Sequence, residues 1–157
     1  MKTPVLIISA ALLISVSACG QSGKDVPASV SSAFTQKFPN ASKVKWGKEN
    51  EKEWEAEFKM DGKEYSANFD LAGAWIETEY EVAATELPAV VMAAIEKESA
   101  GLKIGEAAVS ETKDGKVYEV TAGKGKAAMA FVVDSNGVIQ QKGLVKEEEE
   151  KEESEKQ

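Results

Sequence analysis

Acidic side chains at alternate positions are the groups in this sequence that could carry out acid–base chemistry. Glu55 and Glu57 stand two residues apart in an alternating segment, and Glu119 lies in a second segment of the same kind. Paired carboxylates catalyse glycoside hydrolysis when their surroundings hold the two pKa values apart. Strand residues two apart share one face, and an open face without a cleft gives those pKa values little reason to separate. The pair therefore does not indicate an enzyme.

The side-chain types that are missing exclude most other enzyme chemistry. The sequence has no histidine and no arginine, and Cys19 is its single cysteine. Histidine is the usual base for serine and cysteine nucleophiles and the commonest zinc ligand. Arginine supplies the planar fork that binds phosphate, and a net charge of −8 repels a polyanion. We expect neither catalysis nor nucleic-acid binding, and no cofactor.

Two further candidate sites are better explained as parts of the fold. Asp134-Ser135-Asn136-Gly137 has the start of a calcium-binding loop but lacks the later ligands, so we predict a hairpin turn and no metal. Trp46, Trp54 and Trp75 could form an aromatic platform for a glycan or peptide. The alternation places Trp46 and Trp54 on the side that packs under a helix, so we expect them in the core.

The start of the chain has the composition of an export signal. A lysine, a short apolar segment and two small residues precede Cys19. This order resembles the lipobox of bacterial lipoproteins, which implies that Cys19 is the lipid attachment point. A transmembrane anchor would need roughly 20 apolar residues, and a plain secretory signal would leave Cys19 unmodified. We predict a lipoprotein signal peptide at 1–18 and a lipidated tether at 19–24. The protein would be lipid-anchored to a membrane of the bacterial cell envelope, periplasmic or surface-exposed.

The other end of the chain is charged throughout. Residues 146–157 contain seven glutamates and three lysines. This composition cannot bury enough apolar surface to order itself, and it predicts a disordered acidic tail. The alternative is a tail that binds a basic partner or divalent cations weakly.

The intervening sequence repeats itself, with one copy at 25–82 and a second at 83–145. Val26-Pro27-Ala28 opens an amphipathic segment, and Leu87-Pro88-Ala89 opens a similar one 61 residues later. Proline suits the first turn of a helix, and apolar residues four apart then line one face. Short alternating segments follow each helix, and their connections are too short for parallel crossovers. We predict an α+β fold of two tandem repeats, each a helix and about four antiparallel strands, with the helices on one face of the sheet.

Alternation assigns the strand residues of the first copy to two faces. The side chains predicted to face the helix are Trp54, Ala56, Phe58, Tyr65, Ala67 and Phe69. The side chains predicted to be polar and solvated on the other face are Glu55, Glu57, Lys59, Ser66, Asn68 and Asp70. In the second copy Ala130 and Val132 replace Ser66 and Asn68, so this strand is apolar on both sides. An apolar strip beside acids suits a partner with an apolar or basic surface.

We therefore place the candidate binding site on the open face of the sheet. Its residues are Glu55, Glu57, Glu119, Ala128, Ala130 and Val132. The alternative is that a neighbouring segment, such as the region of Leu144 and Val145, simply covers the apolar strip.

The motifs of residues 25–145 are the two proline-led helix starts, Phe38-Pro39-Asn40 before a Trp-containing strand, and Lys63-Glu64-Tyr65-Ser66 before a glycine turn. They resemble those of the PepSY-like family of exported bacterial proteins, whose fold is similar to that of the β-lactamase-inhibitor protein. Ser99-Ala100-Gly101 departs from the family pattern, so we expect the second helix to end differently. The resemblance implies a non-catalytic module that binds a protein or peptide of the envelope on the open face. A small-ligand or envelope-polymer accessory protein and a structural envelope component are the alternatives.

Overall fold

The computed structural model describes residues 25–145 of the 157-residue chain. The predicted signal peptide (1–18), the tether (19–24) that carries Cys19, and the acidic tail (146–157) lie outside the described residues. No helix within the described part has the length and apolar character needed to cross a membrane.

The described residues form two α-helices, two single-turn 3₁₀ helices and eight strands. In chain order the elements are α1 (Ala28–Lys37), β1 (Ser42–Lys48), β2 (Glu53–Met60), β3 (Lys63–Asp70), β4 (Trp75–Glu81), η1 (Ala84–Glu86), α2 (Ala89–Glu98), β5 (Ile104–Thr112), β6 (Gly115–Ala122), η2 (Gly125–Ala127), β7 (Met129–Asp134) and β8 (Ile139–Leu144).

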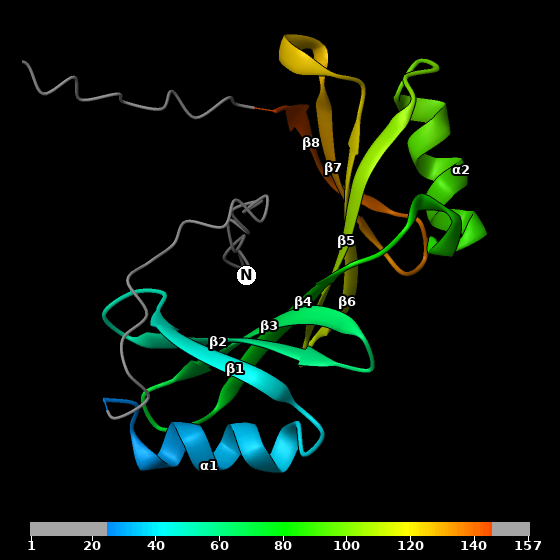
Figure 1. Ribbon diagram of the computed structural model, residues 1–157. Coiled ribbons are helices and arrows are strands. Elements are labelled where there is room, and N and C mark those ends of the chain that lie inside the picture. The colour runs from blue at the N-terminus through cyan, green and yellow to red at the C-terminus, as the bar shows by residue number, and fades with distance from the viewer. Residues whose placement is uncertain (1–24, 146–157) are drawn as a thin grey trace, which may run out of the picture.

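All eight strands belong to one antiparallel sheet, in the order of the sequence from β1 to β8. The α+β prediction is therefore confirmed, and the β4–β5 pair makes the sheet continuous from one half to the other. Figure 1 shows that the sheet bends between its halves, with α1 and α2 on the outer side of the bend. The inner side is not covered by any described helix or strand, and we call it the open face.

Both helices begin directly after a proline, at Pro27 and Pro88. The fixed φ of proline suits a helix start, where its missing N–H removes no helical hydrogen bond. Each helix then buries two apolar residues four apart against the sheet, as its periodicity predicts. The buried residues are Val30 and Phe34 in α1 and Val91 and Ile95 in α2.

The two helices end differently, as the departure from the family pattern led us to expect. After α1, Phe38 donates its N–H to the carbonyl of Phe34, and Pro39 follows. After α2, Ala100 and Gly101 take positive φ angles of 53° and 81°. Glycine adopts such a left-handed conformation without strain, which allows the sharp exit into β5.

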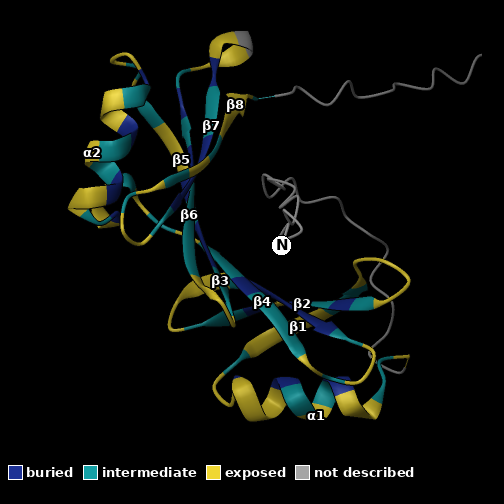
Figure 2. Ribbon diagram, turned by 180° about the vertical axis from the view of Figure 1, so that it is seen from behind, coloured by how far each residue is buried: buried dark blue, intermediate teal, exposed yellow. Residues whose placement is uncertain are grey.

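Two apolar clusters lie between the sheet and the helices, one under each helix (Figure 2). The first contains Val30, Phe34, Phe38, Trp54, Ala56, Phe58, Ala67 and Phe69. The second contains Leu87, Val91, Ile95, Ala107, Val120, Ala122, Phe131 and Val133. Tyr65 and Trp46 pack against the first cluster, and the Trp46 ring meets Phe34 edge-on at 5.2 Å. The helix-facing residues predicted for the first half are confirmed, as are the positions of Trp54 in the core and of Trp46 packed against it.

The same face of the sheet carries both clusters. The Tyr65 and Tyr80 rings contact each other at 5.1 Å across the β3–β4 pair, and Tyr80 is the cross-strand partner of Val109 on β5. These side chains bridge the clusters beneath α1 and α2. The other side of the same strands is consequently the open face throughout.

Each half closes with the same turn, at Asp70 and at Asp134. In both turns one carboxylate oxygen accepts the backbone N–H groups two and four residues later, at distances between 2.8 and 3.0 Å. The carboxylate is thus hydrogen-bonded to backbone groups of its own turn, which is the usual role of aspartate in a turn. The hairpin turn predicted at Asp134 is confirmed.

Candidate functional site

Two cross-strand rows of side chains form the centre of the open face. The first row runs from Glu79 on β4 to Ser110 on β5. The second row is Glu81, Ala108, Glu119, Val132 and Gln141, one residue from each of β4 to β8. Acids and small apolar residues therefore alternate across the strands at this place.

A hollow lies over these rows. Ala108, Ala130 and Val132 supply apolar walls, and Glu79 and Glu119 stand among them. Two exposed acids, Glu81 and Glu106, also line the hollow. A concave site with apolar walls and a few polar groups is typical of a binding site.

The structure brings together part of the predicted site. Glu119, Ala130 and Val132 line the hollow, whereas Glu55 and Glu57 lie on β2, on the same face but outside the hollow. Ala128 is buried at the entrance to β7 and does not line it either.

Sequence reasoning missed Glu79, Ala108 and Ser110. Glu79 lies opposite Ser110 because β4 pairs with β5, which is a long-range feature. Ala108 lies opposite the predicted Glu119 in the β5–β6 pair. The acids at alternate positions of β4, Glu77, Glu79 and Glu81, were the available signal.

The prediction of a solvated polar face is wrong for Ser66 and Asn68, which are only 7% and 9% exposed. The sheet bends toward this side, so neighbouring side chains lean over one another. The Asn68 amide donates to Glu77 at 3.5 Å, and the Ser110 hydroxyl donates to the other oxygen of Glu77 at 3.4 Å. Short polar residues of β3 and β5 thus form a buried layer on either side of Glu77 on β4.

The apolar character of β7 on both sides is confirmed. Phe131 and Val133 are buried in the second cluster, and Val132, on the open face, is only 5% exposed. The chain end near Leu144 does not cover this strip. Leu144 pairs with Met129 in the plane of the sheet and is 66% exposed.

The carboxylates of the open face also differ from the expectation of ordinary solvated acids. Burial, together with the charges of Glu77 and Glu119 and further acids, raises the pKa of Glu79 to about 8. Burial, with a contribution from Glu77, raises the pKa of Glu119 to about 7. Burial is also the main cause that raises the pKa of Glu55 above its ordinary value, so the expectation for this residue was wrong.

Glu119 has a further unusual property. Its Oε1 atom is completely shielded from solvent and has no hydrogen-bond partner in the part of the chain that the structure describes. A buried acceptor without a donor costs about 1–3 kcal/mol, and more when the group is charged. The site therefore has an unused capacity to accept a hydrogen bond.

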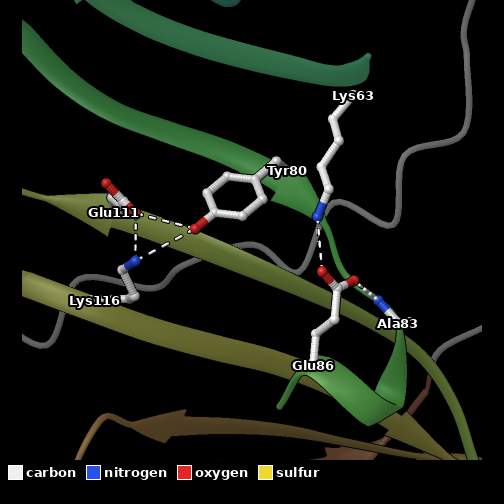
Figure 3. Close-up of polar contacts among 6 residues, drawn as sticks. All are labelled: Lys63, Tyr80, Ala83, Glu86, Glu111 and Lys116. Carbon is white, nitrogen blue, oxygen red and sulfur yellow. Dashed lines mark hydrogen bonds and ion pairs between the residues drawn. The ribbon is translucent and has the colours of Figure 1, made fainter. Parts of the chain in front are cut away.

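The acids on the helix side are, by contrast, paired (Figure 3). Lys116 lies 2.5 Å from Glu111, and Tyr80 donates its hydroxyl to the same carboxylate at 3.1 Å. Partial burial alone would raise the pKa of Glu111, but hydrogen bonds from Lys116 and Tyr80 hold it below its ordinary value. Nearby, Lys63 binds Glu86 at 2.9 Å.

None of the ion pairs among residues 25–145 includes a carboxylate of the hollow. The four pairs are Lys59–Glu64, Lys63–Glu86, Lys116–Glu111 and Lys142–Glu98. The described residues also contain no group of three or more side chains suited to hold a metal ion. The geometry thus offers an acidic, partly apolar concave surface that is not neutralised by any cationic side chain that the structure describes.

A bent antiparallel sheet with both helices on its outer side defines the β-lactamase-inhibitor-like class of fold. The family model "Putative beta-lactamase-inhibitor-like, PepSY-like" matches residues 52–141, and the chain belongs to this PepSY-like family.

Solved structures show the same fold. A BLIP-like protein from Bacteroides fragilis has a TM-score of 0.69 at 22% identity, with 79% of this chain and 90% of the other covered. A DUF2874 family protein from Bacteroides ovatus has a TM-score of 0.69 at 20% identity, with 78% and 89% covered. A structure described as "putative periplasmic proteins" from Bacteroides eggerthii has a TM-score of 0.68 at 18% identity, with 76% and 88% covered. A search of the curated proteins gave no match.

Proposed function

We propose that this protein is a non-catalytic binding module that takes a protein or peptide partner on the open face of its sheet. The observation that carries the proposal is the hollow, where the acids Glu79 and Glu119 stand between apolar walls without a cation of the described chain. Aromatic and apolar residues rimmed by charge are the usual anatomy of a protein interface. The inhibitor-like family supports the same function.

The pattern of acidity argues for binding over catalysis. An acid–base pair needs one carboxyl group held neutral and one held charged near neutral pH. Here burial and neighbouring acids raise the pKa values of both Glu79 and Glu119, so the same causes act on both groups and nothing in the site favours opposite roles for them. A partner that brings positive charge would relieve the repulsion that helps to raise them.

We further propose that the chain acts in the bacterial envelope, attached through a lipid on Cys19. The apolar leader and the small residues before this cysteine support the proposal. They lie outside the described residues, so the support comes from the sequence alone. The neighbour described as "putative periplasmic proteins" agrees with an exported location.

We propose as well that the two halves, 25–82 and 83–145, are tandem copies of one unit. Each half has a helix followed by four strands, and each ends in the same aspartate turn. The glycine of each turn approaches its helix closely: a Cβ on Gly73 would lie 2.6 Å from the Ser29 carbonyl oxygen. One on Gly137 would lie 2.9 Å from that of Val90.

A charge-reversal experiment tests the binding function. Glu57 and Glu81 are exposed on the open face, and Glu96 and Asp114 are exposed away from it, on α2 and at the β5–β6 turn. The pair Glu57→Lys/Glu81→Lys should abolish capture of the partner from envelope extract. The pair Glu96→Lys/Asp114→Lys, with the same change in net charge, should leave capture intact. Equal loss in both pairs would contradict binding through the open face.

A further inference from the structure

We infer that the hollow is an anchor site for one basic side chain, lysine or arginine, of the partner. Its aliphatic stem would lie on Ala108, Ala130 and Val132, and its cationic head would bind Glu79 and Glu119. The inference rests on the proposed binding function and names the chemistry of the partner at this site.

The walls of the hollow fit an aliphatic stem. Ala108 and Val132 flank Glu119 as its two cross-strand neighbours, and Ala130 lies two residues from Val132 on the same strand. Directly opposed side chains on one face are about 4.5–5.5 Å apart, so these apolar groups form one continuous surface. Lysine and arginine bury their methylene stems on such surfaces and keep the charged end at a polar group.

The acids fit the charged end of the same side chain. Glu119 Oε1 is buried and has no donor among the described side chains, and none of their ion pairs includes Glu79 or Glu119. A cation entering between the apolar walls would bring a charged donor to the two carboxylates at a partly buried site. Charge-assisted hydrogen bonds of this kind are roughly twice as strong as neutral ones.

The helix side of the same sheet shows the equivalent contact already made. There Lys116 reaches Glu111, and the carboxylate has a lysine and a tyrosine hydroxyl as donors. In the hollow the carboxylates and the apolar walls are present, but the cation is not supplied by the described chain. A basic partner would supply this complement.

Charge also selects against other occupants. A second copy of this chain carries the same acids and a net charge of −8, so face-to-face pairing would bring like charges together. A purely apolar partner would leave the buried Glu119 oxygen without a donor. A basic side chain offers an aliphatic stem to the apolar walls and a cationic donor to the carboxylates.

Titration with four short peptides tests the stem and the charge separately. The peptides are capped Gly-X-Gly, where X is lysine, arginine, norleucine or 2-amino-3-guanidinopropionic acid. Norleucine has the stem without the charge, and 2-amino-3-guanidinopropionic acid has a guanidinium, which stays charged at about pH 9, on a single methylene. Amide NMR shifts of the full chain in a nonionic detergent, at low ionic strength and about pH 9, report binding at residue level, and both carboxyl groups are then ionised.

We expect the lysine and arginine peptides to shift the amides of Ala108, Glu119 and Ala130 with dissociation constants of the order of millimolar. Glu79→Gln and Glu119→Gln should each weaken binding about tenfold or more, and Glu96→Gln, a matched charge change on α2, should not. Glutamine keeps the shape of the side chain, so these variants should fold. Equal shifts by the guanidinopropionic peptide, or no shift by any peptide, would overturn the anchor site.

The titration needs no partner protein. A negative result therefore removes the anchor site and leaves the charge-reversal test of the open face unaffected.

Discussion

Glu119 and Val132 are direct cross-strand partners in the β6–β7 ladder, so a carboxylate stands against an apolar side chain on the open face. Both are shielded by the bend of the sheet: Val132 is 5% exposed, and one oxygen of Glu119 is fully buried. This pairing gives the hollow a carboxylate side and an apolar side.

The stability of the protein should fall as the pH rises. The pKa of Glu79 is raised to about 8 from 4.5, so between these values the folded state keeps a proton that the unfolded state releases. The free energy of unfolding must then decrease with pH in this window, and Glu119 adds to the decrease up to about pH 7. Urea unfolding at a series of pH values measures this slope.

The Glu79→Gln variant isolates the contribution of one carboxyl group. Above about pH 8 it should be more stable than the wild type by about 1 kcal/mol, a figure reduced from the full linkage value because the site is partly hydrated. Glu96→Gln is the control on the exposed surface of α2. A wild-type curve that rises from pH 5 to pH 8 would contradict the raised pKa values.

Binding of a basic peptide should strengthen with pH over the same interval. The groups whose charges act on Glu79 are Glu49, Glu55, Glu77 and Glu119, all acids, and partial burial also opposes its ionisation. A cation favours the charged form, so binding at pH 7 should release protons. Calorimetry in buffers of different ionisation enthalpy counts these protons, and a count of zero with the lysine peptide would contradict the coupling.

Val132 should behave as a core residue although it lies on the face without helices. Val132→Ala should lower the free energy of unfolding by about 1–2 kcal/mol, because it removes buried methyl groups from a packed site. Val138→Ala makes the same chemical change at a position that is 58% exposed, and its effect should be within about 0.5 kcal/mol. Equal effects of the two variants would show that the open-face strip is not packed.

The turn glycines should tolerate no side chain. Gly73→Ala would place a Cβ 2.6 Å from the Ser29 carbonyl oxygen at a φ of +88°, so we expect a loss of about 2–4 kcal/mol. Gly62→Ala is the matched control, because its φ is +81° but nothing lies within 4 Å of the added Cβ. The control should lose only about 1 kcal/mol, from backbone strain. Thermal or urea unfolding distinguishes the two.

The proposed lipid attachment at Cys19 can be tested in cells. Cys19→Ala should stop lipid attachment and leave the protein unprocessed or free of the membrane. Labelling with a fatty-acid analogue and fractionation of the envelope measure both effects. Labelled, membrane-bound Cys19→Ala protein would contradict lipidation at this residue.

Local features of the fold could be predicted from the sequence because they depend on short spacings. Proline-led periodicity identified both helices, and alternation placed Trp54 and Phe58 under α1. The hollow could not be predicted, because it needs the long-range pair of Glu79 with Ser110 between the two halves. The burial of Ser66 likewise depends on the bend of the whole sheet, which no local pattern encodes.

Photocrosslinking in living cells tests the central claim most directly. A photoreactive residue in place of Glu81 lies at the hollow, one in place of Glu57 lies on the same face, and one in place of Glu96 lies on α2. Binding through the open face predicts the same discrete protein adduct from the first two positions and none from the third. An adduct from position 96 alone, or no adduct from the open face, would contradict the account.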